Sequence, residues 1–407
     1  MSGAQAVTVP RSVEKPSSYA WVILAVLYIA TVASAFNQFK APPVLPVLIS
    51  AFNLTLSDAG LLMSVFSVTG FILALPAGFI LHRLGLKATG VIAMGAVVAG
   101  STLGLLCKTT YPLLVSRFIE GAGIGLITIV APAAIAAWFP AEKRGTPIGL
   151  WATCMPVGNI ITFNVAPWLA ELAGWQLVWK TGAVFGLIAF LLFLGLFRMP
   201  RTEEAPREAD PHEEDGETPG FLQALANPGI WLVALQFLCF NVICLALGTY
   251  YPTFLSSVRN YSLSTASFVT SLSTIAAVFS QPVGGYLSDR LGMRRHLIIV
   301  STIIVGFVCL FPFSATGWAI PAVILGFGIV SGAIVPATFA AVPELMGSRR
   351  LTGLGMAVLA MGQNLGMLIG PLMFGHLVES VGWTGAGYAL IPVCAVSVVA
   401  VYKAKFR

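Results

Sequence analysis

Charged side chains are scarce in this sequence. Asp, Glu, Lys and Arg make up 9% of its 407 residues, against roughly 25% in a soluble domain. Hydrophobic residues make up 57%, which is more apolar surface than a soluble core can bury, so a soluble protein is excluded and lipid is the expected solvent. Each membrane crossing needs about 20 apolar residues. The length therefore fits about twelve crossings.

The sequence motifs of enzymes are also missing. There is no Walker loop, so ATP is not expected to drive any transport. The four histidines and six cysteines lack metal-ligand spacing, and no Ser-His-Asp arrangement stands out. We therefore predict no enzyme activity, no metal and no cofactor, and interpret the cysteines as packing residues. The net charge of +6 does not indicate nucleic acid, because the basic residues are distributed among short loops.

Twelve apolar segments can be read along the chain, and one long polar stretch divides them. Residues 199–220 contain eight of the sixteen acids, which is typical of a disordered linker, with a regulatory docking site as the alternative. The predicted parts are an N-terminal half (1–198), an acidic linker (199–220) and a C-terminal half (221–407). The apolar segments begin near Tyr19, Leu61, Thr89, Leu113, Ile148, Trp179, Gly229, Ala266, Leu297, Trp318, Thr352 and Gly385.

The distribution of Lys and Arg predicts the orientation in the membrane. If the N-terminus is inside, 17 of the 22 basic residues fall in inside segments. Basic residues are enriched in cytoplasmic loops. We therefore expect a multi-pass protein of the plasma (inner) membrane with both termini in the cytoplasm. Residues 1–18 are polar and show no secretory cleavage site.

The two halves repeat each other at a nearly constant offset. Asn53 recurs as Asn260 and Gly85 as Gly292, each at an offset of 207, and Gly174 recurs as Gly382 at an offset of 208. Chance does not account for so many aligned residues. Parallel repeats are one plan of membrane transporters, with the substrate site where the repeats meet. The sequence therefore predicts an all-α protein of two pseudo-symmetric six-helix bundles.

A short loop after the eighth apolar segment carries a family resemblance. It contains Gly285, Asp289, Arg290, Gly292 and Arg294, and it resembles the signature loop of the major facilitator superfamily. A degenerate copy contains Gly78, His82, Arg83, Gly85 and Lys87, and the fourth segment has the family's spacing of Arg117, Gly121 and Gly123. The resemblance covers the chain from Tyr19 to Arg407. It implies the major facilitator fold and transport by alternating access.

In this family the loop acts at the cytoplasmic gate. Asp289 can face the N-terminus of a helix in the other half, where the helix dipole is positive, with Arg290 and Arg294 anchoring the interface. In the N-terminal copy His82 replaces the acid beside Arg83, which weakens that attraction. An interfacial His82 without a switching role is the alternative. The fifth segment lacks the glycine-proline pattern of many exchangers, which makes drug antiport less favoured.

Few ionisable residues remain at membrane depth, where a charge costs about 2.5–3.5 kcal/mol. Lys40 follows Asn37 by three positions, so both lie on one helix face, although a lysine snorkelling outward is the alternative. Arg117 and Glu120 are also three apart. Glu120 is the candidate carrier of a coupling proton, and a permanent ion pair with Arg117 is the alternative.

The corresponding positions of the C-terminal half are neutral: Leu247 for Lys40, Ile324 for Arg117 and Phe327 for Glu120. Two cations against one acid predict a positive cavity that prefers an anion. Further polar residues could contact the solute or only join helices. The predicted substrate-binding set is Asn37, Lys40, Arg117, Asn159, Asn241, Tyr250, Gln363 and Asn364.

These residues predict a monomeric secondary transporter that moves a small organic or inorganic anion by proton symport. In detail the chain is similar to the cyanate-permease-like branch, whereas nitrate is disfavoured because the second and eighth segments lack the arginine of nitrate carriers. The alternative is efflux of a drug or neutral metabolite by proton antiport. A sensor that keeps a transporter fold would need a signalling domain, for which only the linker is available.

Overall fold

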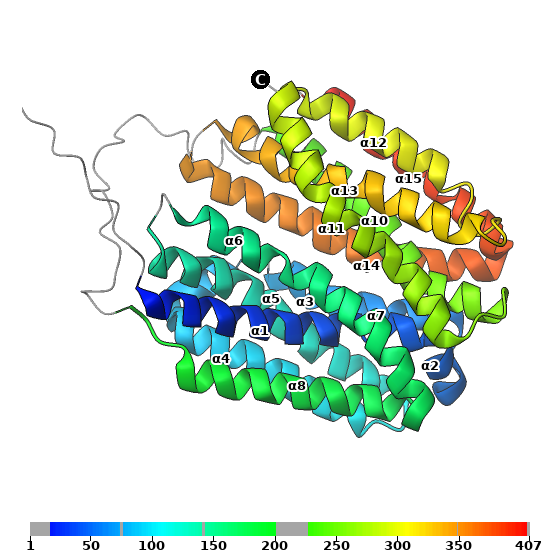
Figure 1. Ribbon diagram of the computed structural model, residues 1–407, viewed down its shortest axis with the longest axis horizontal. Helices are drawn as coiled ribbons and strands as arrows, with labels where there is room; N and C mark the ends of the chain where they lie inside the picture. Colours follow the sequence, from blue (N-terminus) through cyan, green and yellow to red (C-terminus); the bar gives the residue numbers. More distant parts are fainter. Residues whose placement is uncertain (1–16, 74–75, 141–142, 201–226, 348, 405–407) are drawn as a thin grey trace, which may run out of the picture.

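A computed structural model describes residues 17–73, 76–140, 143–200, 227–347 and 349–404. The helices run roughly parallel to the long axis and form two groups (Figure 1). The elements up to residue 198 form one group and those from residue 227 form the other. The predicted linker 199–220 lies almost entirely outside the described residues, so the boundaries of the three parts stay predictions.

The first group contains, in its described residues, eight helices and one short 3₁₀ turn. The double proline Pro42–Pro43 ends the first helix, because proline lacks the backbone donor that a continuing helix needs, and the chain restarts after the turn. The elements are α1 (Ser18–Phe39), η1 (Pro42–Val44), α2 (Leu45–Phe52), α3 (Leu56–Leu73), α4 (Ala77–Leu105), α5 (Thr110–Trp138), α6 (Gly145–Ala152), α7 (Cys154–Ala173) and α8 (Trp175–Leu196).

The second group contains six helices over residues 227–347 and 349–404. Its first helix is capped by Asn227, whose side chain accepts a hydrogen bond from the Gly229 amide at 2.9 Å, as an N-cap residue does. The elements are α10 (Pro228–Ser257), α11 (Leu263–Leu291), α12 (Arg294–Val308), α13 (Ala319–Met346), α14 (Arg349–Tyr388) and α15 (Leu390–Lys403).

The described residues contain ten helices that are long and apolar enough to cross a membrane. Two further crossings follow from shorter helices: α12 has 15 residues, and α15 continues the last residues of α14 beyond a kink at Gly382. The total for this part of the chain is twelve, six in each group. The predicted fold class, an all-α membrane protein of two pseudo-symmetric six-helix bundles, is confirmed.

The backbone repeats the offset found in the sequence. Asn53 and Asn260 have φ values of 51° and 57°, and they are the non-glycine residues with positive φ in the described chain. Gly174 and Gly382 have φ values of 77° and 73°, a region that glycine adopts without strain. These two pairs of turns at equivalent places therefore have similar φ values in both halves.

The two ends of the bundle differ in what they contain. We call one the linker end; it holds Arg198 and Asn227, which lie on either side of residues 201–226. Tyr19 donates to the Leu196 carbonyl at 2.7 Å, so α1 begins at this end, and Arg295 donates to the Tyr402 carbonyl, so α15 ends there. The far end holds the turns at Asn53, Gly174, Asn260 and Gly382.

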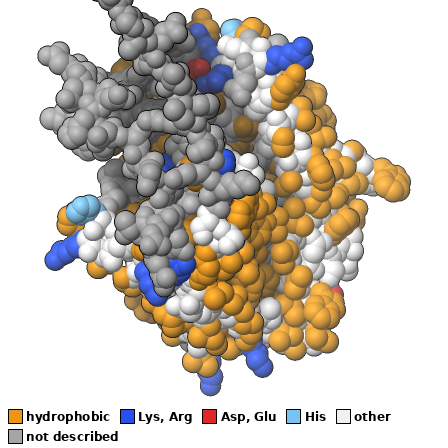
Figure 2. Space-filling model, turned by 60° about the vertical axis from the view of Figure 1, so that its left-hand side comes forward, with side chains coloured by type: hydrophobic (Ala, Val, Ile, Leu, Met, Phe, Trp, Pro, Cys, Tyr) orange, Lys and Arg blue, Asp and Glu red, His pale blue; other side chains and the backbone are white. Residues whose placement is uncertain are grey.

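The flanks of the bundle are apolar. Figure 2 shows hydrophobic side chains covering a broad face, with Lys and Arg side chains at its margins. Large apolar residues on the surface of the molecule include Phe279, which is 74% exposed, and Phe307, which is 62% exposed. An apolar surface around parallel helices belongs to a protein whose solvent is the hydrocarbon of a bilayer.

Within the C-terminal half, α14 lies directly against α10. Gly362, Gly366 and Gly370 are spaced by four positions, so they line one face of α14. A Cβ atom on any of them would collide with the α10 backbone, at Ala234, Leu238 and Val242 respectively. Small residues at such positions let two membrane helices approach closely.

The halves meet along two helix pairs, α3 with α14 and α7 with α11. At the first contact, the Tyr250 hydroxyl of α10 donates to the Leu56 carbonyl at 2.7 Å and lies 3.1 Å from the Pro371 carbonyl. At the second, the Asn164 amide donates to Ser271 Oγ at 3.3 Å.

Candidate functional site

Three charged side chains of the described N-terminal half are completely buried at its centre. Glu120 of α5 lies between two cations: Lys40 Nζ is 2.7 Å from its Oε1, and Arg117 Nη1 is 2.6 Å from its Oε2. All three side chains are 0% exposed. We call them the ion cluster. Two cations and one anion leave it with a formal charge of +1.

Further donors of the ion cluster are satisfied by the end of α1 and by α4. Lys40 Nζ also donates to Asn37 Oδ1 and Ser101 Oγ, both at 2.8 Å. Arg117 donates to the Asn37 and Gln38 carbonyls at 2.6 and 2.8 Å. These carbonyls carry the negative end of the α1 dipole, which stabilises a cation there.

Aromatic rings complete the surroundings of the ion cluster. Lys40 Nζ lies 4.7 Å from the ring centroid of Trp179, and the Arg117 guanidinium lies 4.6 Å from that of Phe66. A cation over an aromatic face is attracted by the ring quadrupole. Lys40 therefore points into the N-terminal bundle, toward neither lipid nor bulk water. Its partners Ser101 and Trp179 belong to other helices, so local spacing gives no sign of them.

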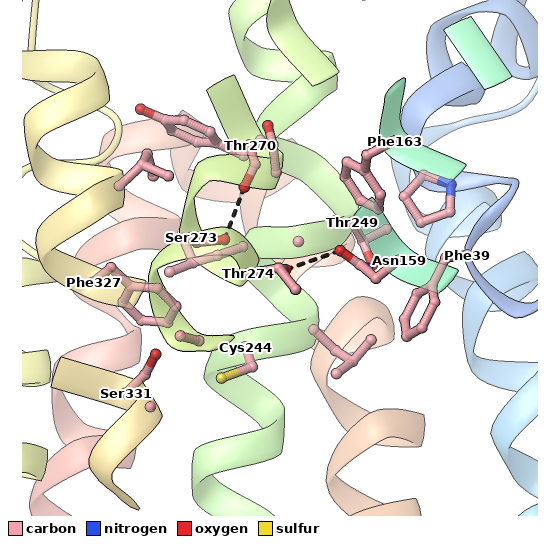
Figure 3. A pocket seen from close by; sticks show the side chains of 18 of the residues that line it. Phe39, Asn159, Phe163, Cys244, Thr249, Thr270, Ser273, Thr274, Phe327 and Ser331 are labelled. Atoms are coloured by element: carbon pink, nitrogen blue, oxygen red, sulfur yellow. Dashed lines mark hydrogen bonds between the residues drawn. The ribbon is translucent and has the colours of Figure 1, made fainter. Parts of the chain in front are cut away.

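A pocket of about 210 Å³ lies between the two halves, mostly against the C-terminal half. Figure 3 shows Asn159, Phe39 and Phe163 on one side and Phe327 and Ser331 on the other. No charged residue belongs to its lining within the described chain. The lining is Phe39, Pro42, Asn159, Phe163, Phe240, Cys244, Leu245, Leu247, Gly248, Thr249, Tyr251, Thr270, Ser273, Thr274, Ala277, Gln281, Ile324, Phe327, Ser331, Gly332 and Val335.

The pocket and the ion cluster occupy equivalent places in the two halves. Adding 207 to positions 37, 40, 117 and 120 gives 244, 247, 324 and 327. All four of these positions line the pocket, as Cys244, Leu247, Ile324 and Phe327. In the N-terminal half these positions are therefore occupied by paired charged side chains. In the C-terminal half the equivalent positions border a pocket. The neutral equivalents are evident from the sequence, but the hollow between them is not.

Among the predicted substrate-binding residues, Asn159 lines the pocket. Its Oδ1 accepts a hydrogen bond from Thr274 Oγ1 of α11 at 2.9 Å, across the boundary between the halves. Asn37, Lys40 and Arg117 lie behind the wall that Phe39 and Pro42 form. These four residues therefore divide between the pocket, which has Asn159, and the ion cluster, which has Lys40 and Arg117 with Asn37 bound to both.

The remaining members of the set lie elsewhere. Asn241 donates to the Phe237 carbonyl of its own helix at 2.8 Å, and Asn364 does the same with Ala360. Tyr250 joins the halves at the far end, while its neighbour Tyr251 lines the pocket. Gln363 is half-buried on α14. Their roles in binding stay predictions.

The residues of the signature loop and its degenerate copy lie at the linker end. His82 and Arg83 are exposed, and Arg290 donates to the Tyr286 hydroxyl at 2.9 Å. Arg294 forms an ion pair with Glu344 of α13 at 2.7 Å, which joins two helices of the same half. The side chain of Asp289 lies outside the described part of the structure, so its predicted contact with the other half stays a prediction.

The sequence did not single out most pocket residues. Thr249, Ser273, Thr274, Gln281 and Ser331 are uncharged and spread over three helices, and serine and threonine are common in membrane helices. One signal in the sequence could have found the pocket: the positions equivalent to Asn37, Lys40, Arg117 and Glu120 under the internal repeat lie in its wall. Among the described residues no group of His, Cys, Asp and Glu could hold a metal ion.

The twelve crossings, the repeated halves and a pocket between them define a multi-pass membrane transporter. The sequence matches the family model described as Major Facilitator Superfamily over residues 27–351 and 260–406. The chain belongs to this superfamily, and it is a transporter, not an enzyme.

Known relatives cover almost the whole chain. It is 23% identical to the "Hexuronate transporter" of Bacillus subtilis (strain 168) over 385 residues, which is 90% of each protein. It is 23% identical over 379 residues to the "Probable sulfoacetate transporter SauU" of Cupriavidus necator, covering 89% of this chain and 88% of that one. A solved bacterial homolog of the human lysosomal transporter Spinster, inward-facing and unoccupied, superposes with a TM-score of 0.77 at 18% identity. That match covers 96% of this chain and 94% of the other.

Proposed function

We propose that this protein is a secondary active transporter that moves a small organic anion across the membrane by alternating access, in symport with protons. The observation that carries this proposal is the buried ion cluster, with its net positive charge directly behind the pocket wall. Phe39 and Pro42 line the pocket, and Lys40 between them turns its side chain the other way, toward Glu120.

The charge behind the wall favours an anion in the pocket. At an effective dielectric constant of 20, two unit charges separated by roughly 10 Å interact with an energy of about 1.7 kcal/mol. An attraction of that size favours an anion over a neutral solute by roughly fifteenfold. The names of several relatives agree with a negatively charged solute, since hexuronate, sulfoacetate, galactarate and glucarate are all anions of acids.

Glu120 is our candidate for the coupling proton. Its two carboxylate oxygens hold Lys40 and Arg117. Protonation would therefore release one cation and raise the charge of the ion cluster from +1 to +2, which strengthens its attraction for an anion. Binding of the solute and of the proton would then favour each other. The alternative is that Glu120 stays permanently ion-paired and only supports the fold.

The halves would rock about the pocket so that it opens first to one side of the membrane and then to the other. Asn159 and Thr274 contact each other across the halves, so a solute that competes for them acts on both. His82, Arg83, Asp289, Arg290 and Arg294 are our candidates for gating at the linker end. We further propose a monomer in the plasma membrane, with both termini and the linker end in the cytoplasm.

Proteoliposomes loaded with a pH-sensitive dye test the proposal. Glucuronate, sulfoacetate and benzenesulfonate, which carry fixed charge near neutral pH, are added outside, and proton entry is recorded. We expect at least one of them to acidify the lumen. An imposed inward proton gradient should accelerate uptake of the same anion, and uptake that is indifferent to the gradient would rule out coupling.

A matched pair of lysine variants isolates the contribution of the ion cluster. Lys40→Ala should reduce anion transport at least tenfold, because it removes the unit of net positive charge that attracts the anion. Lys108→Ala, at an exposed position at the far end, should leave transport unchanged. Equal rates in both variants would remove Lys40 from the transport mechanism.

The uncharged pocket wall also favours a second candidate, efflux of a neutral metabolite by proton antiport. Aromatic and aliphatic side chains form much of the lining. Faster movement of a neutral solute than of any tested anion would support this function. The finer similarity to the cyanate-permease-like branch stays a prediction, which cyanate in the same assay would test.

A further inference from the structure

We propose that the pocket selects an amphipathic carboxylate, one with an apolar body about the size of a single ring, over a polyhydroxylated acid. The part of this inference that concerns the charged end of the solute rests on the proposed anion transport. The preference for an apolar body is argued independently, from the residues that line the pocket.

The apolar wall is built from the neutral equivalents of the ion cluster. Leu247, Ile324 and Phe327 stand where the N-terminal half has Lys40, Arg117 and Glu120, and Phe240 and Val335 extend the same surface. Removing apolar surface from water stabilises the bound state in proportion to the area buried. A solute body without hydroxyls gains this contribution, whereas a sugar ring would leave its hydroxyls unpaired against the wall.

Several hydroxyls of the lining are already engaged by their own helices. Thr270 donates to the Ala266 carbonyl at 2.8 Å, Ser273 to the Thr270 carbonyl at 2.8 Å and Ser331 to the Gly328 carbonyl at 3.2 Å. They can accept a hydrogen bond from a solute, but they cannot donate one without breaking these contacts. Among the described lining hydroxyls, those of Thr249 and Tyr251 are buried without a partner. A site that recognises several sugar hydroxyls needs more free partners than these two, since discrimination of hydroxyls depends on paired polar groups.

A polar patch for the charged end lies on the opposite side of the pocket. Thr249 Oγ1 is buried without a hydrogen-bond partner among the described residues, and Asn159 uses its Oδ1 for Thr274, which leaves its amide nitrogen as a donor. Figure 3 shows Thr249 and Asn159 beside Phe39 and Phe163, away from Phe327. Phe39 directly precedes Lys40 of the ion cluster. The hydroxyl of Thr249 and the amide of Asn159 therefore lie on the side of the pocket nearer to the ion cluster, where its net positive charge stabilises a carboxylate.

Four probes separate the effect of the solute's apolar body from the effect of its charge. They are benzoate, glucuronate, benzamide and glucose. Their binding to the purified full chain is measured by isothermal titration calorimetry. We expect benzoate to bind at least tenfold more tightly than glucuronate. Glucuronate binding as tightly as benzoate would overturn this inference and leave the anion proposal standing. Benzamide binding as tightly as benzoate would overturn the anion proposal and the charged end of this inference, and would leave only the apolar body standing. No binding by any probe would overturn both.

A matched pair of phenylalanine variants tests the wall itself. Phe327→Ala should weaken benzoate binding about tenfold or more, because the ring supplies apolar contact area. Phe279→Ala, on the exposed flank of α11, should leave binding unchanged. Phe327→Leu keeps most of the volume and guards against misfolding; it should weaken benzoate more than glucuronate. Equal weakening of both probes would overturn the inference.

A different observation carries a second inference: two acidic residues latch the far end of the bundle shut. We infer that Glu171 and Glu379 each hold the first turn of a helix in the opposite half. Glu171 of α7 accepts from the Ser264 amide at 3.2 Å and from its hydroxyl at 3.0 Å. Glu379 of α14 accepts from the Ser57 amide at 2.9 Å.

The two latches are equivalent under the internal repeat. Ser57 and Ser264 differ by 207 positions, and Glu171 and Glu379 differ by 208. Each acid lies near the end of the fifth crossing of its half and faces the N-terminus of α3 or α11, where the helix dipole is positive. The backbone N–H groups of a first helical turn have no partner within the helix, so they readily donate to such a carboxylate. Both contacts must break when the halves separate at the far end.

Hydrogen exchange of the full chain in nanodiscs tests the latches. Glu379→Gln should raise exchange about threefold in the first turn of α3, and Glu171→Gln should do so in α11. The double variant should raise exchange in both turns by more than the product of the single effects, because both latches oppose one movement.

Asp58→Asn is the matched control. Asp58 accepts from the Thr55 amide at 3.1 Å within the same half, so its loss disturbs the start of α3 without touching the other half. It should raise exchange at α3 alone. The latch is overturned if Glu379→Gln leaves the α3 turn unchanged, or if the double variant shows two independent effects.

Discussion

The N-terminal and C-terminal halves share a backbone but differ in what fills its centre. In one, Asn37, Lys40, Arg117 and Glu120 are joined by ion pairs and hydrogen bonds. In the other, Cys244, Leu247, Ile324 and Phe327 border a cavity. Long charged side chains that pair with one another occupy the space that neutral ones leave open. The two halves of a repeat can therefore differ in role: here the N-terminal half holds the charged residues and the C-terminal half forms most of the pocket.

The largest expected effect comes from removing the acid of the ion cluster. Glu120→Gln leaves two buried cations without their counter-charge, and such losses cost about 3–5 kcal/mol. Its equivalent in the other half, Phe327→Leu, should cost less than about 1.5 kcal/mol. Thermal unfolding followed by tryptophan fluorescence measures both. Similar losses of stability in the two variants would break the comparison.

The next effect concerns the end of α1. Asn37→Ala removes an acceptor of Lys40 and a donor to the Gly182 carbonyl, and hydrogen bonds to charged groups contribute about 1.5–3 kcal/mol. Cys244→Ala, its equivalent beside the cavity, should change stability by less than about 1 kcal/mol. The same unfolding assay applies, and a larger effect at Cys244 would contradict a neutral, loosely packed centre in the C-terminal half.

Filling the cavity should stop transport with little loss of stability. Leu247→Trp places a large ring in the pocket, where the open space limits the cost of overpacking to about 1 kcal/mol. We expect anion-driven proton entry into proteoliposomes to disappear while the protein stays folded. Undiminished transport in this variant would show that the solute passes elsewhere.

The smallest effect is expected at the contact between the halves. Asn159→Ala removes the hydrogen bond with Thr274, worth about 0.5–1.5 kcal/mol. Because the residue also lines the pocket, solute affinity should fall more than stability does. Calorimetric titration with benzoate and thermal unfolding separate the two quantities, and a loss of stability alone would assign Asn159 a purely structural role.

The fold could be predicted from the sequence because its causes are local or periodic. Apolar runs of membrane length, the repetition of one half in the other and the glycine spacing of α14 are all properties of the linear chain. The i, i+3 spacing also placed Asn37 beside Lys40 and Arg117 beside Glu120, and the structure contains both pairs.

The site could be predicted only in part, because it depends on how helices rotate about their axes. Nothing in the chain shows that Lys40 turns toward Ser101 and Trp179 while its neighbours Phe39 and Pro42 face the cavity. Rotation of α1 by a fraction of a turn would reverse these orientations. Tertiary packing fixes that angle, and α1 packs against helices such as α7 and α8 that lie far from it along the chain.

The glycine face of α14 has a consequence for how such a protein can change its cargo. Gly362, Gly366 and Gly370 hold α14 mainly against the backbone of α10, at Ala234, Leu238 and Val242. Residues of α10 that border the cavity can therefore be replaced over evolutionary time without altering the seam between the two helices. The glycines that pack α14 against α10 and the residues that line the pocket are different positions. The packing of the two helices can therefore stay the same while the selectivity of the pocket changes.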